Sequence, residues 1–313
     1  MSKISVAMTT YNGEKYLIKQ LNSILNQTKK PDEVIICDDG SSDSTVFLVN
    51  EFIKENNLNN WQIFVNGENL GYIKNFQQAL QKVSGDIIFL CDQDDIWHKE
   101  KIEIMADIMD KNPEIKALAA SYELIDGDDN KICDVSEKFY EPKSKTGAFE
   151  KVNYGKALYY NIAQGCAEAL RREVVEKYCE NILSFILPHD WALNIIAYDD
   201  KGLYFLNQKL ISYRIHSNNT TGISDNDASV QKRIPRLRQY ESFMADVLNL
   251  PISEKQKSEY GDISKFTSAR IDYLTKKRLS LWVKGALAHF SVFFRYFFFT
   301  YLKDLFITVT KKI

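Results

Sequence analysis

Short apolar runs alternate with amphipathic stretches through the first hundred residues of the chain. The segments ISVAM, EVIIC, WQIFV and DIIFLC each predict a buried strand, and apolar residues recur at helical spacing between them. Strands that alternate with helices roughly every thirty residues are typical of a parallel α/β sheet with helices on both faces. In such sheets ligands bind beyond the carboxyl ends of the strands, so the loops there are expected to carry function.

Composition narrows the class of protein further. The 313 residues are 45% hydrophobic and carry a formal net charge of -2, which argues against a nucleic-acid partner. The five cysteines are scattered and include no C-x-x-C pair, a pattern that favours reduced thiols in the cytoplasm over a disulfide frame or a zinc site. The N-terminal MSKISVAMTTYNG lacks the apolar stretch of a signal peptide.

Polar loops follow all four predicted strands. They read TTYNG, CDDGSSD, NGENLGY and CDQDD, and a parallel sheet brings them to one edge. Asp92 and Asp94 stand two residues apart at a strand end and can aim at one point. Clustered carboxylates repel one another unless a cation offsets the charge, and oxygen ligands of this kind suit Mg²⁺ or Mn²⁺. The alternative is an acidic turn that caps a helix near His98.

The second loop offers a nucleoside contact. A carboxylate of Asp38 or Asp39 can accept the ring N3–H of uracil or thymine, whereas cytosine presents an acceptor there. The alternative is that Asp38, Asp39 or Ser41 caps the following helix. Tyr11 can stack on the base or simply pack against the protein.

These motifs, in this order, resemble the inverting glycosyltransferases of family two, which have the GT-A fold. The resemblance runs from Ile4 to about Gly222 and implies a Rossmann-like, mostly parallel sheet flanked by helices, with a C-terminal helical extension. It implies that Asp94 binds the divalent metal and that Asp92 lies near the ribose. The positions that it assigns to the nucleotide-sugar are Thr9, Tyr11, Asp38, Asp39, Asn69, Gly71, Asp92 and Gln93.

The second half of the chain supplies the acceptor side of the resemblance. The acidic loop–helix motif PHDWAL implies that Asp190 is the catalytic base; without the resemblance, its position favours a helix N-cap. His216 is implied as a further metal or phosphate contact, with an ordinary loop histidine as the alternative. The residues placed on the acceptor side are Gly165, Cys166, His189 and Trp191. Gly165 allows close approach there, or serves packing alone.

The combination of DQDD-I-W, HDW and Y-R-x-H resembles the rhamnosyltransferase-like branch. It implies a dTDP-rhamnose donor and a lipid-linked saccharide acceptor, while UDP-linked hexoses remain open. Two other functions are considered: a sugar nucleotidyltransferase, and an inactive relative that serves in a polysaccharide assembly complex. The first would carry a Gly-rich basic loop in place of TTYNGEKY, and the second would have lost carboxylates. A dinucleotide oxidoreductase is disfavoured because no G-x-G-x-x-G follows a strand.

The expected organisation has three parts. Residues 1–222 form the glycosyltransferase domain, with a nucleotide-binding half (1–100) and an acceptor half (101–222); a linker or helical segment (223–250) and a C-terminal helical segment (251–313) follow. Within the acceptor half, 127–154 is expected to be loop-rich, QGCAEALRREVVEKY to be a turn and a helix, and LYFL and KLISYRIH to be two strands. Residues 217–235 are expected to be a loop, with helices from Pro235 onward.

The C-terminal segment is rich in Phe and Tyr, but charged side chains such as Lys284 and Arg295 interrupt it before it reaches the length of a membrane-spanning helix. Basic residues flank it: Lys276, Lys277, Arg278, Lys311 and Lys312. We expect Leu279 to Ile313 to lie on the anionic inner face of the cell membrane without crossing it, which predicts a peripheral cytoplasmic protein. The alternatives are packing on the catalytic domain or on a second copy in a homodimer.

Overall fold

The computed structural model of the chain describes residues 1–132, 142–152, 161–162, 164–180, 186–216, 230–290, 301–302 and 304–305, with only the backbone for 230–232. The chain divides into two compact units. The first comprises Met1–Leu183 and Pro188–Gly222, and the second comprises Ser184–Leu187 and Ile223–Ile313.

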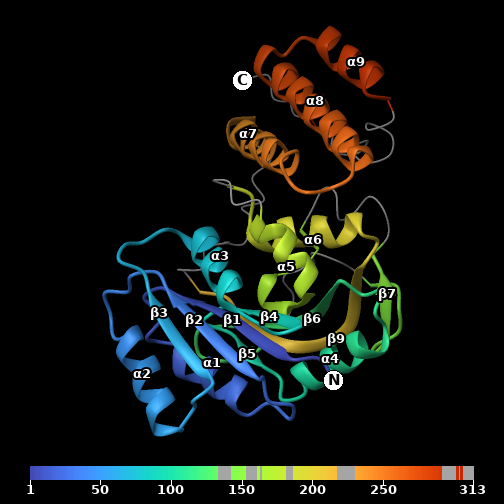
Figure 1. The fold of residues 1–313 in the computed structure, drawn as a ribbon. Helices are drawn as coiled ribbons and strands as arrows, with labels where there is room; N and C mark the ends of the chain where they lie inside the picture. Colours follow the sequence, from blue (N-terminus) through green and yellow to red (C-terminus); the bar gives the residue numbers. More distant parts are fainter. Residues whose placement is uncertain are drawn as a thin grey trace. The chain divides into compact units, whose positions relative to one another are not determined.

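The first unit is built on one mixed sheet (Figure 1). Its strands are β1 (Ile4–Thr10), β2 (Glu33–Asp38), β3 (Trp61–Val65), β4 (Ile87–Cys91), β5 (Ile96–Trp97), β6 (Ala117–Ile125), β7 (Phe149–Lys151), β8 (Glu168–Arg171) and β9 (Leu203–Arg214). The strand order is β3-β2-β1-β4-β8-β6-β9-β5, with β7 also paired to β9. Strands β1 to β4 are mutually parallel, and β8 joins β4 to β6 by antiparallel pairing on both sides. The predicted α/β class, with a sheet flanked by helices, is confirmed.

Helices cover both faces of this sheet. On one face lie α1 (Leu17–Leu25), α2 (Thr45–Glu55) and α4 (Lys101–Lys111), and on the other lie α3 (Tyr72–Lys82), α5 (Arg172–Glu180) and α6 (His189–Asp199). An apolar cluster joins the strands to α1, α2 and α4. Helix α6 is buried from its first residue through Tyr198, as expected of a helix that is largely apolar all round.

Several expectations for the acceptor half are corrected. LYFL and KLISYRIH form the single strand β9, because a register shift opposite Ala120 and Ser121 accommodates the polar residues between them. QGCAEALRREVVEKY is not only a turn and a helix, since it also contains β8 after a short 3₁₀ turn (Gly165–Ala167). The short strands β5 and β7 were not predicted, and β7 lies in the segment expected to be loop.

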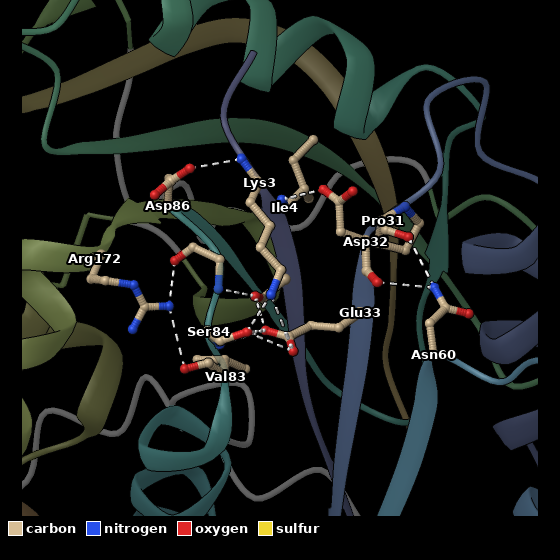
Figure 2. A network of polar contacts seen from close by, with 12 residues as sticks. Lys3, Ile4, Pro31, Asp32, Glu33, Asn60, Val83, Ser84, Asp86 and Arg172 are labelled. Atoms are coloured by element: carbon tan, nitrogen blue, oxygen red, sulfur yellow. Dashed lines mark hydrogen bonds and ion pairs between the residues drawn. The ribbon is translucent and has the colours of Figure 1, made fainter.

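The starts of the strands form a dense polar network (Figure 2). The carboxylates of Asp86 and Asp32 accept the backbone N–H groups of Lys3 and Ile4 at 2.8 and 2.6 Å. Glu33 accepts hydrogen bonds from the backbone and hydroxyl of Ser84. Each charge at this edge therefore has partners within the protein.

The second unit is helical in its described part, with α7 (Val230–Val247), α8 (Glu254–Lys276) and α9 (Leu279–Ala288). Helix α7 begins before Pro235, so the expected loop is wrong for residues 230–235, and residues 217–229 lie outside the described part of the chain. Buried Asp304 accepts a hydrogen bond from Arg270 at 2.8 Å and pairs with Arg233. None of the described helices is long and apolar enough to span a bilayer.

Candidate active site

The loops at the carboxyl ends of β1 and β2 are joined by backbone-to-side-chain hydrogen bonds. The backbone N–H of Asn12 donates to the hydroxyl of Ser41 at 2.9 Å, and that of Gly13 donates to Thr45 at 2.8 Å. These bonds hold the TTYNG and DDGSS loops together at one edge, as the sequence predicted from the strand ends.

Asp38 and Asp39 shape the loops around them. Asp38 is fully buried and accepts the hydroxyl of Thr10 at 2.7 Å, together with the N–H and the hydroxyl of Ser41. Asp39 accepts the backbone N–H groups of Leu70 and Gly71, each at 2.8 Å. Helix α2 begins only at Thr45, after Ser44, so neither aspartate is its N-cap.

The loop that Asp39 holds contains the third motif. Asn66 adds an amide N–H to Asp39 at 3.0 Å, so three of the roughly four acceptor positions of that carboxylate are taken within the protein. Exposed Asn69 accepts the N–H of Gly71, whose φ of 86° suits glycine immediately before α3. Thr9 is buried at 8% exposure below this loop edge.

Tyr11 is held through its backbone and leaves its ring free. The side-chain amide of Gln93 accepts the N–H of Tyr11 at 2.8 Å and donates to its carbonyl at 3.0 Å. A Cβ on Gly13 would lie 2.1 Å from Oε1 of Gln93, so this amide pair requires glycine there. The Tyr11 side chain is 46% exposed, which fits a stacking surface better than core packing.

The acidic motif after β4 is electrostatically strained. Burial and the negative charge of Asp95 raise the pKa of Asp92 well above its usual value. Burial and the charge of Asp94 raise the pKa of Asp95 to about 7. Helix α4 begins at Lys101 after Glu100, so the aspartates do not cap it. Their repulsion is the condition that a bound cation relieves.

One buried cation lies behind these carboxylates. Lys101 is fully buried, its ammonium lies 3.6 Å from the centre of the Trp97 ring, and it donates to the carbonyl of Cys166. Burial lowers the pKa of Lys101 to about 8. Ligand atoms of Asp92, Asp95 and Cys166 lie within 4.8 Å of one another, but burial raises the pKa of the Cys166 thiol, and a protonated thiol is a poor ligand for Mg²⁺ or Mn²⁺.

Asp94 and His216, the two residues predicted to contact metal, face each other. Nε2 of His216 lies 2.8 Å from a carboxylate oxygen of Asp94, and each side chain is 16% exposed. Arg214 fixes the loop from the end of β9: its backbone N–H donates to Asp95 at 3.0 Å and its Nε to the carbonyl of Asp94 at 2.7 Å. An imidazole and carboxylates with partial access to solvent are a suitable oxygen and nitrogen ligand set for Mn²⁺ or Mg²⁺.

Asp190 lies in the first turn of α6 and is 7% exposed. One of its oxygens accepts the amide of Asn161 at 2.7 Å and the N–H of Gly165 at 3.2 Å, and the other accepts the N–H of Trp191 at 2.8 Å. The charge of Asp190 is close enough to contribute to the raised pKa of Asp92. The carboxylates of two distant chain segments therefore share one site.

The predicted acceptor-side residues pack around Asp190. Cys166 and Trp191 are buried at 1% and 6% exposure. His189 is 5% exposed, stacks on Phe76 with ring centres 3.8 Å apart, and has its pKa lowered to about 4 by burial. A Cβ on Gly165 would meet both His189 and Asp190 at 3.2 Å. These residues pack next to Asp190 at the start of α6.

Sequence reasoning assigned no role to Lys101 or Arg214, although each left a signal. Lys101 stands one turn before Met105 on the apolar face of its helix, and Arg214 follows the apolar run of β9 directly. A charged residue on a buried face calls for a partner. Arg214 bonds Asp94 and Asp95 of the acidic motif, and Lys101 donates to the carbonyl of Cys166.

The comparisons with known proteins agree with this geometry. The model of the family "Glycosyl transferase family 2" matches residues 5–179. The UDP-Glc:alpha-D-GlcNAc-diphosphoundecaprenol beta-1,3-glucosyltransferase WfgD of Escherichia coli is 30% identical over 74% of this chain and 83% of its own. The dTDP-rhamnosyl transferase RfbG of Shigella flexneri is 27% identical over 74% of this chain and 79% of its own.

Among solved structures, residues 1–349 of S. aureus TarS in complex with UDP-GlcNAc are 20% identical, with a TM-score of 0.60, over 87% of this chain and 72% of that one. The likeness shows the shared GT-A fold. The family match decides against the nucleotidyltransferase that the sequence left open. The chain belongs to glycosyl transferase family 2 and is a glycosyltransferase that uses nucleotide-sugar donors.

Proposed function

We propose that the protein is a metal-dependent, inverting glycosyltransferase that moves a sugar, with rhamnose favoured, from a dTDP- or UDP-sugar to a hydroxyl of a lipid-linked saccharide. The observation that carries the proposal is the meeting of Asp92, Asp94 and Asp190 at one edge of the sheet, where the pKa of Asp92 is raised. Such clusters of perturbed carboxylates are typical of functional sites.

Asp190 is the proposed general base. A carboxylate there takes the proton from the acceptor hydroxyl while that oxygen attacks the anomeric carbon, and the diphosphate leaves from the opposite face. Hydrogen bonds from Asn161, Gly165 and Trp191 hold the carboxylate of Asp190 in place at the start of α6. One base acting in a single displacement inverts the configuration.

Asp94, with His216, is the proposed metal contact, and Asp92 the contact to the ribose. A divalent metal bound there supplies positive charge to the departing diphosphate. Within the protein, Arg214 holds the backbone of Asp94 and buried Lys101 supplies a fixed positive charge behind Asp92. Both keep the acidic loop in place before a donor arrives.

The proposed nucleobase of the donor is uracil or thymine. The free acceptor position of Asp39 can take the ring N3–H, and the exposed ring of Tyr11 offers a stacking face. The named donors of WfgD and RfbG, a UDP-sugar and a dTDP-sugar, share that N3–H group. Rhamnose is favoured by the motif resemblance and by the name of RfbG.

A lipid-linked acceptor would place the enzyme on a membrane surface, at the inner face. WfgD carries such an acceptor in its name. In this chain, α9 exposes Leu279, Val283 and Leu287 at four-residue spacing, by 60%, 43% and 69%. The adjoining Lys276, Lys277 and Arg278 are exposed and suit anionic lipid headgroups.

The test is a screen of purified protein against dTDP-rhamnose, UDP-glucose, UDP-GlcNAc and GDP-mannose with Mn²⁺ or Mg²⁺, using an undecaprenyl-diphosphate-linked saccharide as acceptor. We expect transfer from a dTDP- or UDP-sugar, and inverted anomeric configuration in the product by NMR. Calorimetry with UDP, dTDP, GDP and CDP measures which nucleobase the site prefers. Transfer only from GDP-mannose, or tighter binding of GDP or CDP, would overturn the proposed donor class.

A further inference from the structure

A series of hydrogen-bonded side chains leads from Asp190 through half-buried Asn161 to two buried residues, Asn194 and Glu168. The amide of Asn161 donates to Asp190 at 2.7 Å, and its oxygen accepts the amide of Asn194 at 3.1 Å. The same amide nitrogen of Asn194 donates to Oε1 of Glu168 at 2.5 Å. Asn194 stands one helical turn after Asp190 on α6, and Glu168 begins β8.

The inner end of this series is the carboxyl group of Glu168, and among the described residues no cation is bonded to it. Glu168 and Asn194 are both 0% exposed. The ammonium of buried Lys101 donates a hydrogen bond to the carbonyl of Cys166. Burial and the charge of Asp190 raise the pKa of Glu168 well above its usual value. A buried carboxyl group in this setting keeps its proton.

Two atoms of the Glu168–Asn194 pair find no hydrogen-bond partner in the part of the chain that the structure describes. They are Oε2 of Glu168 and Oδ1 of Asn194. These are the second oxygen of the same carboxyl group and the oxygen of the same amide. Both are acceptors when Glu168 is ionised, but a proton on Oε2 makes one a donor for the other. With that proton, the pair can make two complementary hydrogen bonds, as a carboxylic acid and an amide do.

We propose that Glu168 is a protonated positioning residue that, paired with Asn194, orients the amide of Asn161 and thereby the carboxylate of Asp190. The pair fixes which end of the Asn194 amide is the donor. Asn161 must then turn its oxygen toward Asn194 and its nitrogen toward Asp190. Three acceptor positions of Asp190 are then taken by Asn161, Gly165 and Trp191, and the one that remains is held in a fixed direction for the acceptor hydroxyl.

The inference rests on the proposed role of Asp190, and three variants test it. In Glu168→Gln, the side-chain amide can both accept from and donate to Asn194, as the protonated acid does. Glu168→Leu leaves the amide of Asn194 without its partner in the interior. The double variant Glu168→Leu/Asn194→Leu removes both partners, a change that often costs little stability.

We expect Glu168→Gln to keep kcat within about threefold and Glu168→Leu to lower it by about tenfold or more, out of the roughly 10²–10⁴-fold typical of a general base. KM for the nucleotide-sugar should stay unchanged in both. The double variant should regain the melting temperature of the wild type but not its kcat, because no amide at position 194 then orients the side chain of Asn161. If the double variant regains both, or if Glu168→Gln loses as much kcat as Glu168→Leu, Glu168 does not position the base.

Infrared difference spectra between the wild type and Glu168→Gln test the proton without any turnover. The wild type should show the carbonyl band of a protonated carboxyl group, and the variant should lack it. Loss of ionised carboxylate bands instead would contradict the acid–amide pair. If the wild type transfers no sugar from any donor, the proposed function fails, while the infrared spectra still decide whether this pair exists.

Discussion

Acidic side chains at the two ends of the same strands have pKa values shifted in opposite directions. At the amino edge, burial alone would raise the pKa of Glu33, but hydrogen bonds from Ser5 and Ser84 outweigh it and hold that pKa below its usual value. At the carboxyl edge, burial and neighbouring charges raise the pKa values of Asp92 and Asp95. Donors within the protein offset the charge of Glu33 at the amino edge, whereas the acidic groups at the carboxyl edge carry negative charge that the protein alone does not offset.

The contrast separates structural acids from functional ones. Asp86 and Glu33 accept backbone N–H groups and stabilise the sheet in their ionised forms. Asp92 and Asp95 cost stability when ionised, and only a ligand such as a divalent cation offsets that cost. Substitutions at the two edges should therefore differ in kind: those at the amino edge lower stability, and those at the carboxyl edge lower activity.

The largest effect is expected at Asp190, which joins the carboxyl edge from α6. Asp190→Asn should lower kcat by about 10²–10⁴-fold, because the amide cannot take the acceptor proton, while donor binding stays nearly intact. Kinetics with the donor found in the screen, together with UDP calorimetry, measures both. Asp32→Asn at the amino edge is the control and should keep kcat. An equal loss of donor affinity in Asp190→Asn would make Asp190 a donor-side or structural residue.

The pH dependence of stability should have opposite signs at the two edges. The pKa of Asp95 is about 7 when folded, so between about pH 4 and 7 the folded protein keeps a proton that the unfolded chain has lost, and the metal-free protein loses stability as pH rises. Each unit by which the pKa of Asp95 is raised corresponds to about 1.4 kcal/mol of stability. The pKa of Glu33 is lowered, so its contribution is present above its usual pKa and is lost as pH falls through the lowered value.

Thermal unfolding in EDTA at pH 5 and pH 8 compares the two groups. Asp95→Asn should raise the melting temperature at pH 8 and change it little at pH 5, where Asp95 is already protonated. Glu33→Gln should lower the melting temperature at pH 8. An Asp95→Asn variant that is destabilised equally at both values would show that Asp95 is a structural acid like Glu33.

A smaller effect is expected from crowding the loop that bears Tyr11. Gly13→Ala would push Gln93 away from the backbone of Tyr11, since the new Cβ would lie 2.1 Å from its Oε1. The loss of a hydrogen-bond pair should weaken UDP binding by about tenfold or less. Gly67→Ala is the matched control, because a Cβ there meets no atom within 4 Å. Calorimetry that gives both variants the same UDP affinity would remove Gln93 from the donor site.

The smallest effect on sugar transfer is expected from substitutions in α9. The side chains that this helix exposes at Leu279, Val283 and Leu287 are apolar and not charged. Leu279→Ser/Leu287→Ser should reduce flotation with anionic liposomes, since each fully buried side chain of this kind contributes up to about 1.5–3 kcal/mol. Phe47→Ser on α2, at a side chain 65% exposed, is the control and should float as the wild type does. Unchanged flotation of the α9 variant, or its conversion from dimer to monomer, would assign this face to protein contacts.

How much the sequence predicts depends on the range of the interaction. Alternating strands and helices are predictable because apolar runs and helical spacing are local, and the meeting of Gln93 with the loop of Tyr11 follows from the geometry of strand ends. Strands β5 and β8 are too short to leave a periodic signal. The roles of Lys101, Glu168 and Arg214 could not be predicted because each depends on a partner far away in the chain.

The most direct test of the central claim is a calorimetric titration of UDP into the wild type, Asp94→Asn and Asp86→Asn, each with Mn²⁺ and with EDTA. If the carboxyl edge is charged in order to receive a metal-bound diphosphate, the wild type and Asp86→Asn should bind UDP more tightly with Mn²⁺ than with EDTA, and Asp94→Asn should lose that difference. Equal UDP affinity of the wild type with Mn²⁺ and with EDTA would contradict the account.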